Sequence, residues 1–416
     1  MTDGMIADKP VQVNGRLYRR PAAPVVVICI DGSEPGYIEA AIAKGLCPNL
    51  DRIMKTGAST TALSVIPSFT NPNNLSIITG RPPAWHGIAG NYFYDREAGV
   101  EVMMNDARFL RAPTILAEFQ GAGCKVAMVT AKDKLRTLLG KGLDFATGTA
   151  VAFSSEKADK ANKAENGIDD VLGFVGLPLP EVYSADLSEF VFAAGVKLLR
   201  TFKPDVMYLS TTDYVQHKAG PGSTVADAFY AMFDRYVGEL DAAGCALVMT
   251  ADHGMNDKHL PDGQPDVIYL QEILDEALGA GTTRVLLPIT DPYVAHHGSL
   301  GSFATVYVEP ERRQAVLDLV RKLDGITLVL SSEEACHLFE LPADRIGDVV
   351  VLSGKHNVIG TAAAKHDLSG LTEPLRSHGG LTEQTVPMIA NRRIEVPVGR
   401  TLRNFDVFDV ALNLVQ

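Results

Sequence analysis

Carboxylate and imidazole side chains follow three apolar runs of the sequence, at the point where each run ends. The runs span residues 25–30, 206–210 and 246–250, and the side chains that follow them are Asp31, Asp213, His217, Asp252 and His253. Continuous apolar runs of this length are typical of strands that are buried on both faces of a parallel sheet. Because ligands bind outside the carboxyl ends of such strands, we expect these side chains to meet at one edge of a sheet.

The chemistry of such a group is that of a divalent metal site. Several carboxylates packed together repel one another unless cations lie between them. Asp213 and His217 are four residues apart, so one helical turn would place both on the same face. His378 stands in the segment SHGG, where glycines allow the backbone to come close to a site. A mixed set of imidazoles and carboxylates suits zinc best, with manganese and iron next.

Thr70 is the candidate nucleophile of the chain. It stands in SFTNPNN, just ahead of a helix-like stretch whose N–H groups and dipole would favour an anion. A threonine hydroxyl is a weak nucleophile, so it needs metal coordination or a neighbouring base to attack phosphorus. Ser68 is the nearest competing hydroxyl. The ordinary alternatives are a helix cap at Thr70 or Asp213 and a turn at Asp31.

The elements that would position these residues alternate between strand and helix patterns. A fourth apolar run covers residues 125–130, and helix-like stretches separate the runs at residues 39–44, 113–120, 189–201 and 223–241. This alternation predicts an α/β fold with a doubly wound, mostly parallel sheet. Segments 148–155 and 173–180 contain Gly, Ser or Pro and are interpreted as loops.

The amino-acid composition of the sequence changes after Asp257. The next forty or so residues are rich in Pro, Gly, Asp and His, and a strand–helix–strand pattern follows them. We expect a catalytic core made of residues 1–257 and 346–416, with an inserted cap domain at residues 258–345. The runs DVVVLSG and VPMIA are expected to complete the core sheet. Most histidines in or near the cap, His296 and His297 among them, are expected to be exposed or structural.

Composition and charge exclude several classes of protein. The formal net charge is −12, which argues against a protein that holds a nucleic-acid backbone. Five cysteines are scattered with no C-x-x-C pair, as is typical of reduced thiols. No stretch has the roughly 20 apolar residues of a membrane helix, and the first residues lack the apolar centre of a secretory signal. We therefore expect a soluble cytoplasmic protein with no nucleic-acid or membrane partner.

Five short motifs occur in the order seen in one enzyme superfamily. They are IDG, FTNPNN, TTDYVQH, TADHGM and SHGG, and with them the chain resembles the alkaline phosphatase superfamily, near the nucleotide pyrophosphatase/phosphodiesterases. The resemblance covers residues 25–255 and about 345–416. It implies an alkaline-phosphatase-like fold, a homodimer and two zinc ions. One ion would be held by Asp31, Thr70, Asp252 and His253, and the other by Asp213, His217 and His378.

Within the superfamily, the chain is most similar to enzymes that hydrolyse the carbon–phosphorus bond of phosphonoacetate to acetate and phosphate. The resemblance implies a phosphonate substrate and a phospho-threonine intermediate on Thr70. Asn91 could donate a hydrogen bond to a phosphoryl oxygen, although an Asn beside a glycine is equally typical of a turn. His217 is expected to contact the substrate as well as the metal. Lys132 and Lys134 could neutralise the substrate carboxylate and so stabilise the leaving carbanion; their ordinary alternative is a solvated surface.

Three other functions fit parts of this pattern. A nucleotide pyrophosphatase/phosphodiesterase could use the same metals and Thr70, and would need an aromatic slot such as Tyr92, Phe93 and Tyr94 could provide. A phosphomutase of the same superfamily ranks third, after the phosphonate hydrolase and the phosphodiesterase. A non-catalytic metal-binding or scaffold protein would be expected to lack the nucleophile or some ligands, whereas all seven positions here carry suitable residue types.

Overall fold

A seven-stranded sheet forms the centre of the larger part of the protein. The structure is a computed structural model that describes residues 9–289 and 299–416. The strand order is β4–β19–β10–β3–β9–β7–β8, with bounds Ala58–Leu63, Thr385–Ala390, Ala246–Thr250, Val25–Cys29, Val206–Ser210, Val126–Thr130 and Ala150–Ser154. The five strands from β10 to β8 are parallel, whereas β19 is antiparallel to both of its neighbours. All four predicted strands lie among these five.

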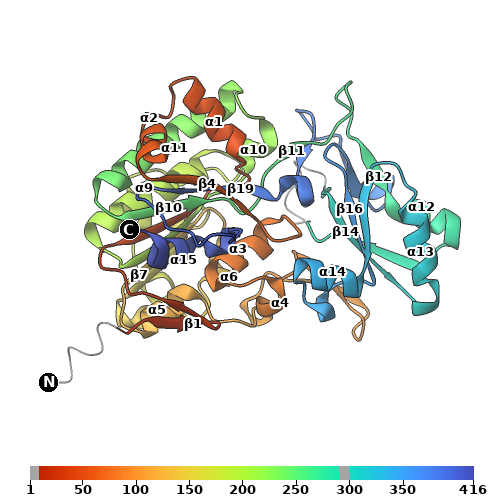
Figure 1. Ribbon diagram of the computed structural model, residues 1–416, viewed down its shortest axis with the longest axis horizontal. Helices are drawn as coiled ribbons and strands as arrows, with labels where there is room; N and C mark the ends of the chain where they lie inside the picture. The colour runs from red at the N-terminus through yellow and green to blue at the C-terminus, as the bar shows by residue number, and fades with distance from the viewer. Residues whose placement is uncertain (1–8, 290–298) are drawn as a thin grey trace.

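Helices cover both faces of this sheet (Figure 1). One face packs against α1 (Pro35–Ala43), α2 (Pro48–Thr56), α9 (Asp186–Thr201) and α11 (Thr224–Ala242). The other packs against α3 (Thr70–Thr79), α5 (Ile115–Gly121), α6 (Asp133–Leu139) and α15 (Val407–Asp409). Alternate residues of one strand serve the two cores, since Val26 and Ile28 join the first and Val27 and Cys29 the second. This arrangement confirms the predicted doubly wound α/β fold.

A second, antiparallel sheet lies to the right of the first in Figure 1. Its strand order is β13–β14–β16–β15, with bounds Thr283–Leu286, Phe303–Val308, Val349–Ser353 and Ile326–Ser331. A separate apolar core joins it to α12 (Leu270–Leu278), α13 (Arg313–Val320) and α14 (Ser332–Phe339). Nearby, β12 (Val267–Tyr269) pairs with β17 (Val358–Gly360). The chain enters and leaves this part through β11 (Asn256–Asp257) and β18 (Arg376–Ser377), which pair with each other.

Two interpretations of the sequence are wrong at the level of single strands. Segment 148–155, read as a loop, contains the buried edge strand β8, which pairs with β7; its short run between Gly and Ser residues resembles a turn. The run DVVVLSG forms β16, which pairs with β14 and β15 and not with the first sheet. A continuous apolar run indicates a buried strand but does not show which sheet holds it.

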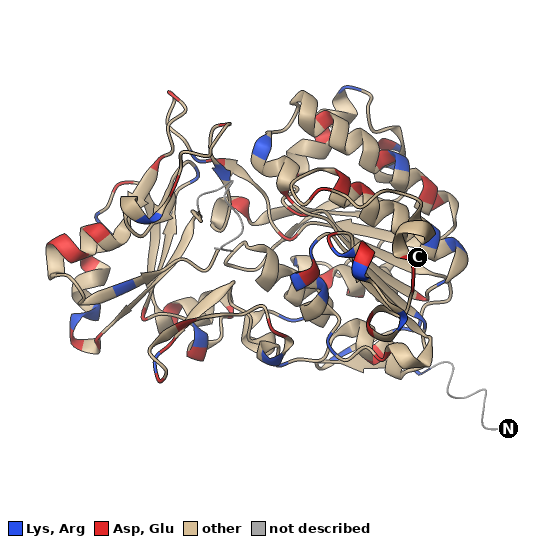
Figure 2. Cartoon of the chain, turned by 180° about the vertical axis from the view of Figure 1, so that it is seen from behind, with Lys and Arg blue, Asp and Glu red and all other residues tan. Residues whose placement is uncertain are grey.

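Other expectations concern segments and surfaces. VPMIA does complete the first sheet, as part of β19, and α8 (Val171–Val175) occupies the start of the second expected loop. The division into a catalytic core and an inserted cap stays a prediction, and His296 and His297 lie outside the described residues. Acidic and basic residues are interspersed over both parts of the chain (Figure 2). All five cysteines are free thiols, and no helix among the described residues combines the length and apolarity needed to cross a bilayer.

A buried ion pair joins the start of the second part to the segment that carries SHGG. Lys258 Nζ lies 2.9 Å from Glu383 Oε1, and both side chains are fully buried. Glu383 also accepts hydrogen bonds from Asn256 Nδ2 at 2.6 Å and from Gly380 N at 2.9 Å, while Lys258 donates to the carbonyl of Lys355 at 2.8 Å. Burial lowers the pKa of Lys258, and the adjacent Glu383 opposes that shift. The pair therefore links segments about 125 residues apart at the base of the second part.

We expect Glu383→Ala to lower the free energy of unfolding by about 3–5 kcal/mol, because it leaves the Lys258 ammonium buried without its counter-charge. Urea unfolding monitored by circular dichroism measures the change. The matched control is Glu239→Ala, which removes the exposed 3.0 Å ion pair with Arg200 and is expected to cost less than about 1 kcal/mol. Equal, small losses in the two variants would contradict the role given to Glu383.

Candidate active site

Three adjacent strands of the first sheet end in the predicted residues. Asp31 follows β3, Asp213 follows β9, and Asp252 with His253 follows β10. The short helix α10 (Tyr214–Lys218) begins directly after Asp213 and brings His217 Nε2 to 2.9 Å from Asp213 Oδ2. Asp213 makes no side-chain capping bond to that helix, so the capping alternative does not hold.

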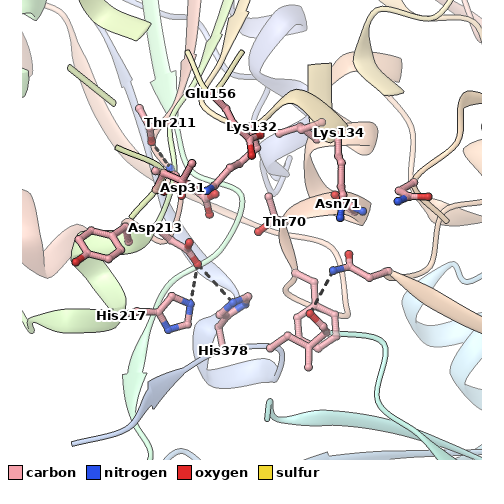
Figure 3. A pocket seen from close by; sticks show the side chains of 18 of the residues that line it. Asp31, Thr70, Asn71, Lys132, Lys134, Glu156, Thr211, Asp213, His217 and His378 are labelled. Carbon is pink, nitrogen blue, oxygen red and sulfur yellow. Dashed lines mark hydrogen bonds and ion pairs between the residues drawn. The ribbon is translucent and has the colours of Figure 1, made fainter. Parts of the chain in front are cut away.

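His378 and Thr70 reach the same place from distant parts of the chain. His378 directly follows β18, and its Nε2 lies 3.7 Å from Asp213 Oδ2, so that Asp213 stands between two imidazoles (Figure 3). Thr70 is the first residue of α3, and its Oγ1 lies 3.4 Å from His253 Nε2. The cap residue of α3 is Phe69, so Thr70 does not cap the helix. Ser68, the competing hydroxyl, is buried and donates to the carbonyl of Gly380.

His253 connects Asp31, Asp252 and His378 to one another. His253 Nε2 lies 3.2 Å from Asp31 Oδ1 and 3.8 Å from Asp252 Oδ2. The rings of His253 and His378 stack with their centroids 3.6 Å apart. The structure therefore brings all seven sequence-predicted residues into one cluster.

Each imidazole in the cluster is oriented by a backbone carbonyl. Nδ1 of His217 lies 2.8 Å from the carbonyl oxygen of Arg376, and Nδ1 of His253 lies 2.8 Å from that of Gly254. Nδ1 of His378 lies 2.7 Å from the carbonyl oxygen of Ser68. Because a carbonyl oxygen only accepts, each Nδ1 carries a proton and each Nε2 is directed at the carboxylates. Metal-binding histidines are held in this way.

The buried carboxylates of the cluster repel one another, and added positive charge would stabilise them. Burial raises the pKa of Asp31 well above its usual range, and the neighbouring Asp252 and Asp213 raise it further. Asp31 Oδ1 is buried and accepts no hydrogen bond. Burial, together with the other two imidazoles, lowers the pKa of His378, so its ring is neutral and its Nε2 lone pair faces Asp213. A divalent cation would relieve these contacts, so the donor set fits a metal.

Two groups of three residues could each hold a metal ion, because the donor atoms within each group all lie within 4.8 Å of one another. One set consists of Asp213, His217 and His378, as the resemblance implies, and the other of Asp31, Asp213 and His253. The second set contains Asp213 where the resemblance implies Asp252. Asp252 Oδ1 accepts hydrogen bonds from the backbone N–H groups of Gly32 and His253, which hold that carboxylate in place.

Buried asparagines of the FTNPNN motif support the cluster, and the sequence analysis assigned them no role. Asn74 Nδ2 donates to Asp252 Oδ2 and to the carbonyl of Thr70, at 3.1 Å each. Its Oδ1 accepts from the hydroxyls of Tyr208 and Ser210. Asn74 therefore fixes the nucleophile candidate and a carboxylate relative to each other. The only sequence signal was the motif itself, because these partners lie far away along the chain.

Gly32 is required by the close approach of two of these segments. Its φ is +70°, and a Cβ added there would lie 2.9 Å from Cβ of Asp213. No larger residue fits between β3 and α10 without moving Asp213.

A cavity of about 230 Å³ opens onto the cluster. Its lining includes Asp31, Thr70, Asp213, His217 and His378 from the cluster. Asn91, Lys132 and Lys134 line it as well, as do Asn71, Asn105, Glu156 and Tyr183, which the sequence analysis did not single out. Figure 3 shows Lys132 extending toward Asp31. The side chains predicted to bind substrate and five of the seven predicted to bind metal therefore face one cavity.

The contacts of Lys132 and Asn91 show how these two residues are placed. Lys132 Nζ donates to the carbonyl of Val182 at 3.1 Å and lies 5.5 Å from the centre of the Tyr183 ring. Asn91 Nδ2 donates to the carbonyl of Ile289 at 3.2 Å. Lys132 is thus a half-buried residue of the cavity wall.

The expected aromatic slot does not line this cavity. Phe93 packs on Phe109 and Tyr94 on Tyr307, and neither they nor Tyr92 are among the described lining residues. These aromatics lie on β5 (Tyr92–Asp95), whose strand geometry directs them into other contacts. The cavity instead contains Tyr183 and Tyr214.

Two buried residues outside the cluster hold its surroundings in place. His86 is buried, its Nδ1 accepts from the N–H of Ile88, and burial lowers its pKa to about 3, so it is a neutral packing residue. Arg376 holds His217 through its carbonyl, and its Nε donates to the carbonyl of Gln216 at 2.8 Å.

Comparison with known proteins gives a family and close structural relatives. The model of the family "Type I phosphodiesterase / nucleotide pyrophosphatase" matches residues 25–381. Among curated proteins, a venom phosphodiesterase of Macrovipera lebetinus is 25% identical over 244 residues, which cover 56% of this chain and 26% of that protein. Ectonucleotide pyrophosphatase/phosphodiesterase 1 of Saccharomyces cerevisiae is 24% identical over 284 residues, 61% of this chain and 36% of that protein. The matched region is therefore only a quarter to a third of these relatives.

Solved structures match over nearly the whole chain. Phosphonoacetate hydrolase from Sinorhizobium meliloti 1021, in complex with phosphonoacetate, is 60% identical with a TM-score of 0.95 and covers 98% of this chain and 99% of its own. Murine ectonucleotide pyrophosphatase/phosphodiesterase 5 is 19% identical with a TM-score of 0.63, covering 94% of this chain and 95% of its own. The murine protein shares the fold, whereas the bacterial one shares both the fold and most of the sequence.

We expect Asp213→Asn to weaken zinc binding by at least about 100-fold, because Asp213 stands between His217 and His378 and belongs to both sets of donors. Isothermal titration of the metal-free protein with zinc measures the affinity. Asp234→Asn is the matched control, since Asp234 is a buried carboxylate that accepts from the N–H of Leu50 at 2.7 Å, outside the cluster. A similar loss of affinity in both variants would contradict the assignment.

Proposed function

The chain belongs to the type I phosphodiesterase / nucleotide pyrophosphatase family, and from that premise we propose that it hydrolyses the carbon–phosphorus bond of phosphonoacetate. The observation that carries the proposal is the content of one small cavity. Two imidazoles and a hydroxyl group beside carboxylates suit a phosphoryl group, and two lysines in the same cavity suit a carboxylate. The 60% identity to a phosphonoacetate hydrolase over nearly the full length of both chains supports this substrate.

We propose that the cluster holds two zinc ions, with manganese or iron as substitutes. One would be bound by Asp31, Thr70, Asp252 and His253, and the other by Asp213, His217 and His378. When bound, the ions would supply Lewis acidity that lowers the pKa of the Thr70 hydroxyl and neutralises charge on the phosphoryl oxygens. Nitrogen and oxygen donors with fixed Nε2 atoms support this assignment.

Thr70 would be the nucleophile. Its Oγ1 would lose its proton to solvent and form a bond to phosphorus while the carbon–phosphorus bond breaks, and the electron pair of that bond would pass to the methylene carbon. Protonation of this carbon gives acetate, and water then releases phosphate from the phospho-threonine. The position of Thr70 at the start of α3, with its carbonyl fixed by Asn74, supports this role.

The other cavity residues would bind the substrate. Asn91 would exchange its hydrogen bond to Ile289 for one to a phosphoryl oxygen, and His217 would lie against the same group. Lys132 and Lys134 would bind the carboxylate, so that charge developing on the carbon delocalises onto neutralised oxygens.

A nucleotide pyrophosphatase/phosphodiesterase that uses the same residues is the second candidate. The family itself and the presence of Tyr183 and Tyr214 in the cavity favour it. We further propose that the enzyme acts in the cytoplasm as a homodimer; the five free thiols suit a reducing compartment.

Phosphate release from phosphonoacetate tests the proposal. We expect zinc-loaded protein to release phosphate, a chelator to abolish release, and Thr70→Ala to lower the rate by more than about 10³-fold, because the attacking oxygen is gone. Mass spectrometry of the quenched wild type is expected to show one added phosphoryl group, absent from the variant. Turnover of a nitrophenyl phosphodiester that exceeds that of phosphonoacetate by orders of magnitude would favour the second candidate instead.

The lysines are tested by a substrate that lacks the carboxylate. We expect Lys132→Ala or Lys134→Ala to lower kcat/KM for phosphonoacetate by about 100-fold and to leave an aryl phosphonate ester nearly unaffected, since only the first substrate needs its carboxylate neutralised. The exposed Lys163→Ala is the control. Equal losses on both substrates would mean that the lysines act in some other way.

A further inference from the structure

His217 stands on α10, a helix of only five residues, Tyr214–Lys218. A single helical turn gains too few hydrogen bonds to be stable by itself, so the place of His217 depends on contacts from other segments. The first turn is closed by the N–H of His217, which donates to the carbonyl of Asp213 at 3.0 Å. The other end of the helix carries backbone carbonyls that helix geometry leaves without intrahelical partners.

Side chains from two distant segments bind the carbonyls at the end of α10. Arg376 Nε donates to the carbonyl of Gln216 at 2.8 Å. The hydroxyl of Tyr37, on α1, donates to the carbonyl of Ala219 at 2.8 Å. Burial raises the pKa of Tyr37 to about 12, so the hydroxyl keeps its proton. Arg376 Nη2 donates to the same hydroxyl at 3.1 Å, so the two side chains that hold the helix also bind each other.

The guanidinium of Arg376 is itself fixed by the strand pair β11–β18. The side chain of Arg376 is 8% exposed, and its Nη1 pairs with the carboxylate of Asp257 on β11. Its Nη2 also lies 3.5 Å from the carbonyl oxygen of Met255. The backbone of Arg376 belongs to β18, which pairs with β11. Both ends of the residue are therefore held by the same strand pair.

Arg376 also contacts His217 through its backbone. Its carbonyl oxygen lies 2.8 Å from His217 Nδ1 and so orients the imidazole ring, whereas its guanidinium holds the helix that carries the ring. This double attachment leaves His217 Nε2 at 2.9 Å from Asp213 Oδ2. A substitution of the Arg376 side chain leaves the carbonyl in place and removes only the hold on the helix.

We propose that Arg376 is a positioning residue for His217, and that its guanidinium, by holding the end of α10, keeps the imidazole in place to bind metal. This inference rests on the proposed function, because it assumes that the cluster binds two metal ions. It goes further in giving a side chain that would touch neither metal nor substrate a part in the affinity of one metal site.

Arg376→Met tests the proposal, because methionine keeps an unbranched stem and removes every donor. Arg376→Lys, which retains the charge and a donor group, is the milder variant. Arg345→Met is the matched control, since the side chain of Arg345 is 11% exposed and its Nη1 donates to the carbonyls of Gly87 and Phe109 at 2.6 and 2.7 Å, outside the cluster. A general loss of stability would affect the Arg376 and Arg345 variants alike.

Cobalt(II) titration of the metal-free proteins, followed by visible absorption, measures the affinity and reports the ligands of each ion. We expect the wild type to bind two ions. Arg376→Met should bind one of them about 10- to 100-fold more weakly and with an altered spectrum, and Arg376→Lys should recover part of that affinity. Arg345→Met should bind both ions as the wild type does. In a His217→Ala background, Arg376→Met should cause no further loss, because the ring through which Arg376 acts is gone.

Wild-type affinity at both sites in Arg376→Met and Arg376→Lys would overturn the proposal. An equal loss in Arg345→Met would also overturn it, because the effect would then be general destabilisation. An undiminished loss in the His217→Ala background would mean that Arg376 acts through another ligand. A wild type that fails to bind two ions would instead overturn the two-metal assignment, and this inference with it, so the two kinds of failure are distinct.

Discussion

Parallel strands that end side by side bring the residues after them into a confined space. Neighbouring strands lie about 4.8 Å apart, and Asp31, Asp213 and Asp252 follow three strands that are adjacent in the sheet. The chain surrounds these carboxylates with imidazoles, each held at Nδ1 by a backbone carbonyl. Carboxylates packed this closely repel one another, and a bound cation would relieve that repulsion.

The supporting structure behind the cluster consists of buried amides. Asn73 donates to the carbonyls of Pro67 and Phe69 and accepts from Asn404 near the end of the chain. Asn74 connects the start of α3 to Asp252. An amide offers both donors and acceptors, so it can bind backbone and carboxylate together without adding charge to a site already crowded with it.

Sequence reasoning found the residues whose signal is local. Asp31, Asp213 and Asp252 each follow a recognisable apolar strand, and the motifs then indicated His378 and Thr70. The same reasoning failed at β8, whose edge strand is short and flanked by glycine and small polar residues, and at β16, whose apolar run could belong to either sheet. It could not find the partners of Asn74 or Glu383, because they lie 178 and 125 residues away. Such pairings exist only once the chain has folded, and no spacing rule predicts them.

The pairing of β11 with β18 has a consequence for how such a protein can diversify. All of the chain between them leaves and returns through two short adjacent segments, one ending four residues after His253 and the other directly preceding His378. A different domain could be inserted between Asp257 and Arg376 while His253 and His378 keep their positions, provided that the pairing of β11 with β18 is retained. Conversely, a displacement of the segment between β11 and β18 would reach the imidazoles of His253 and His378 through only a few peptide bonds.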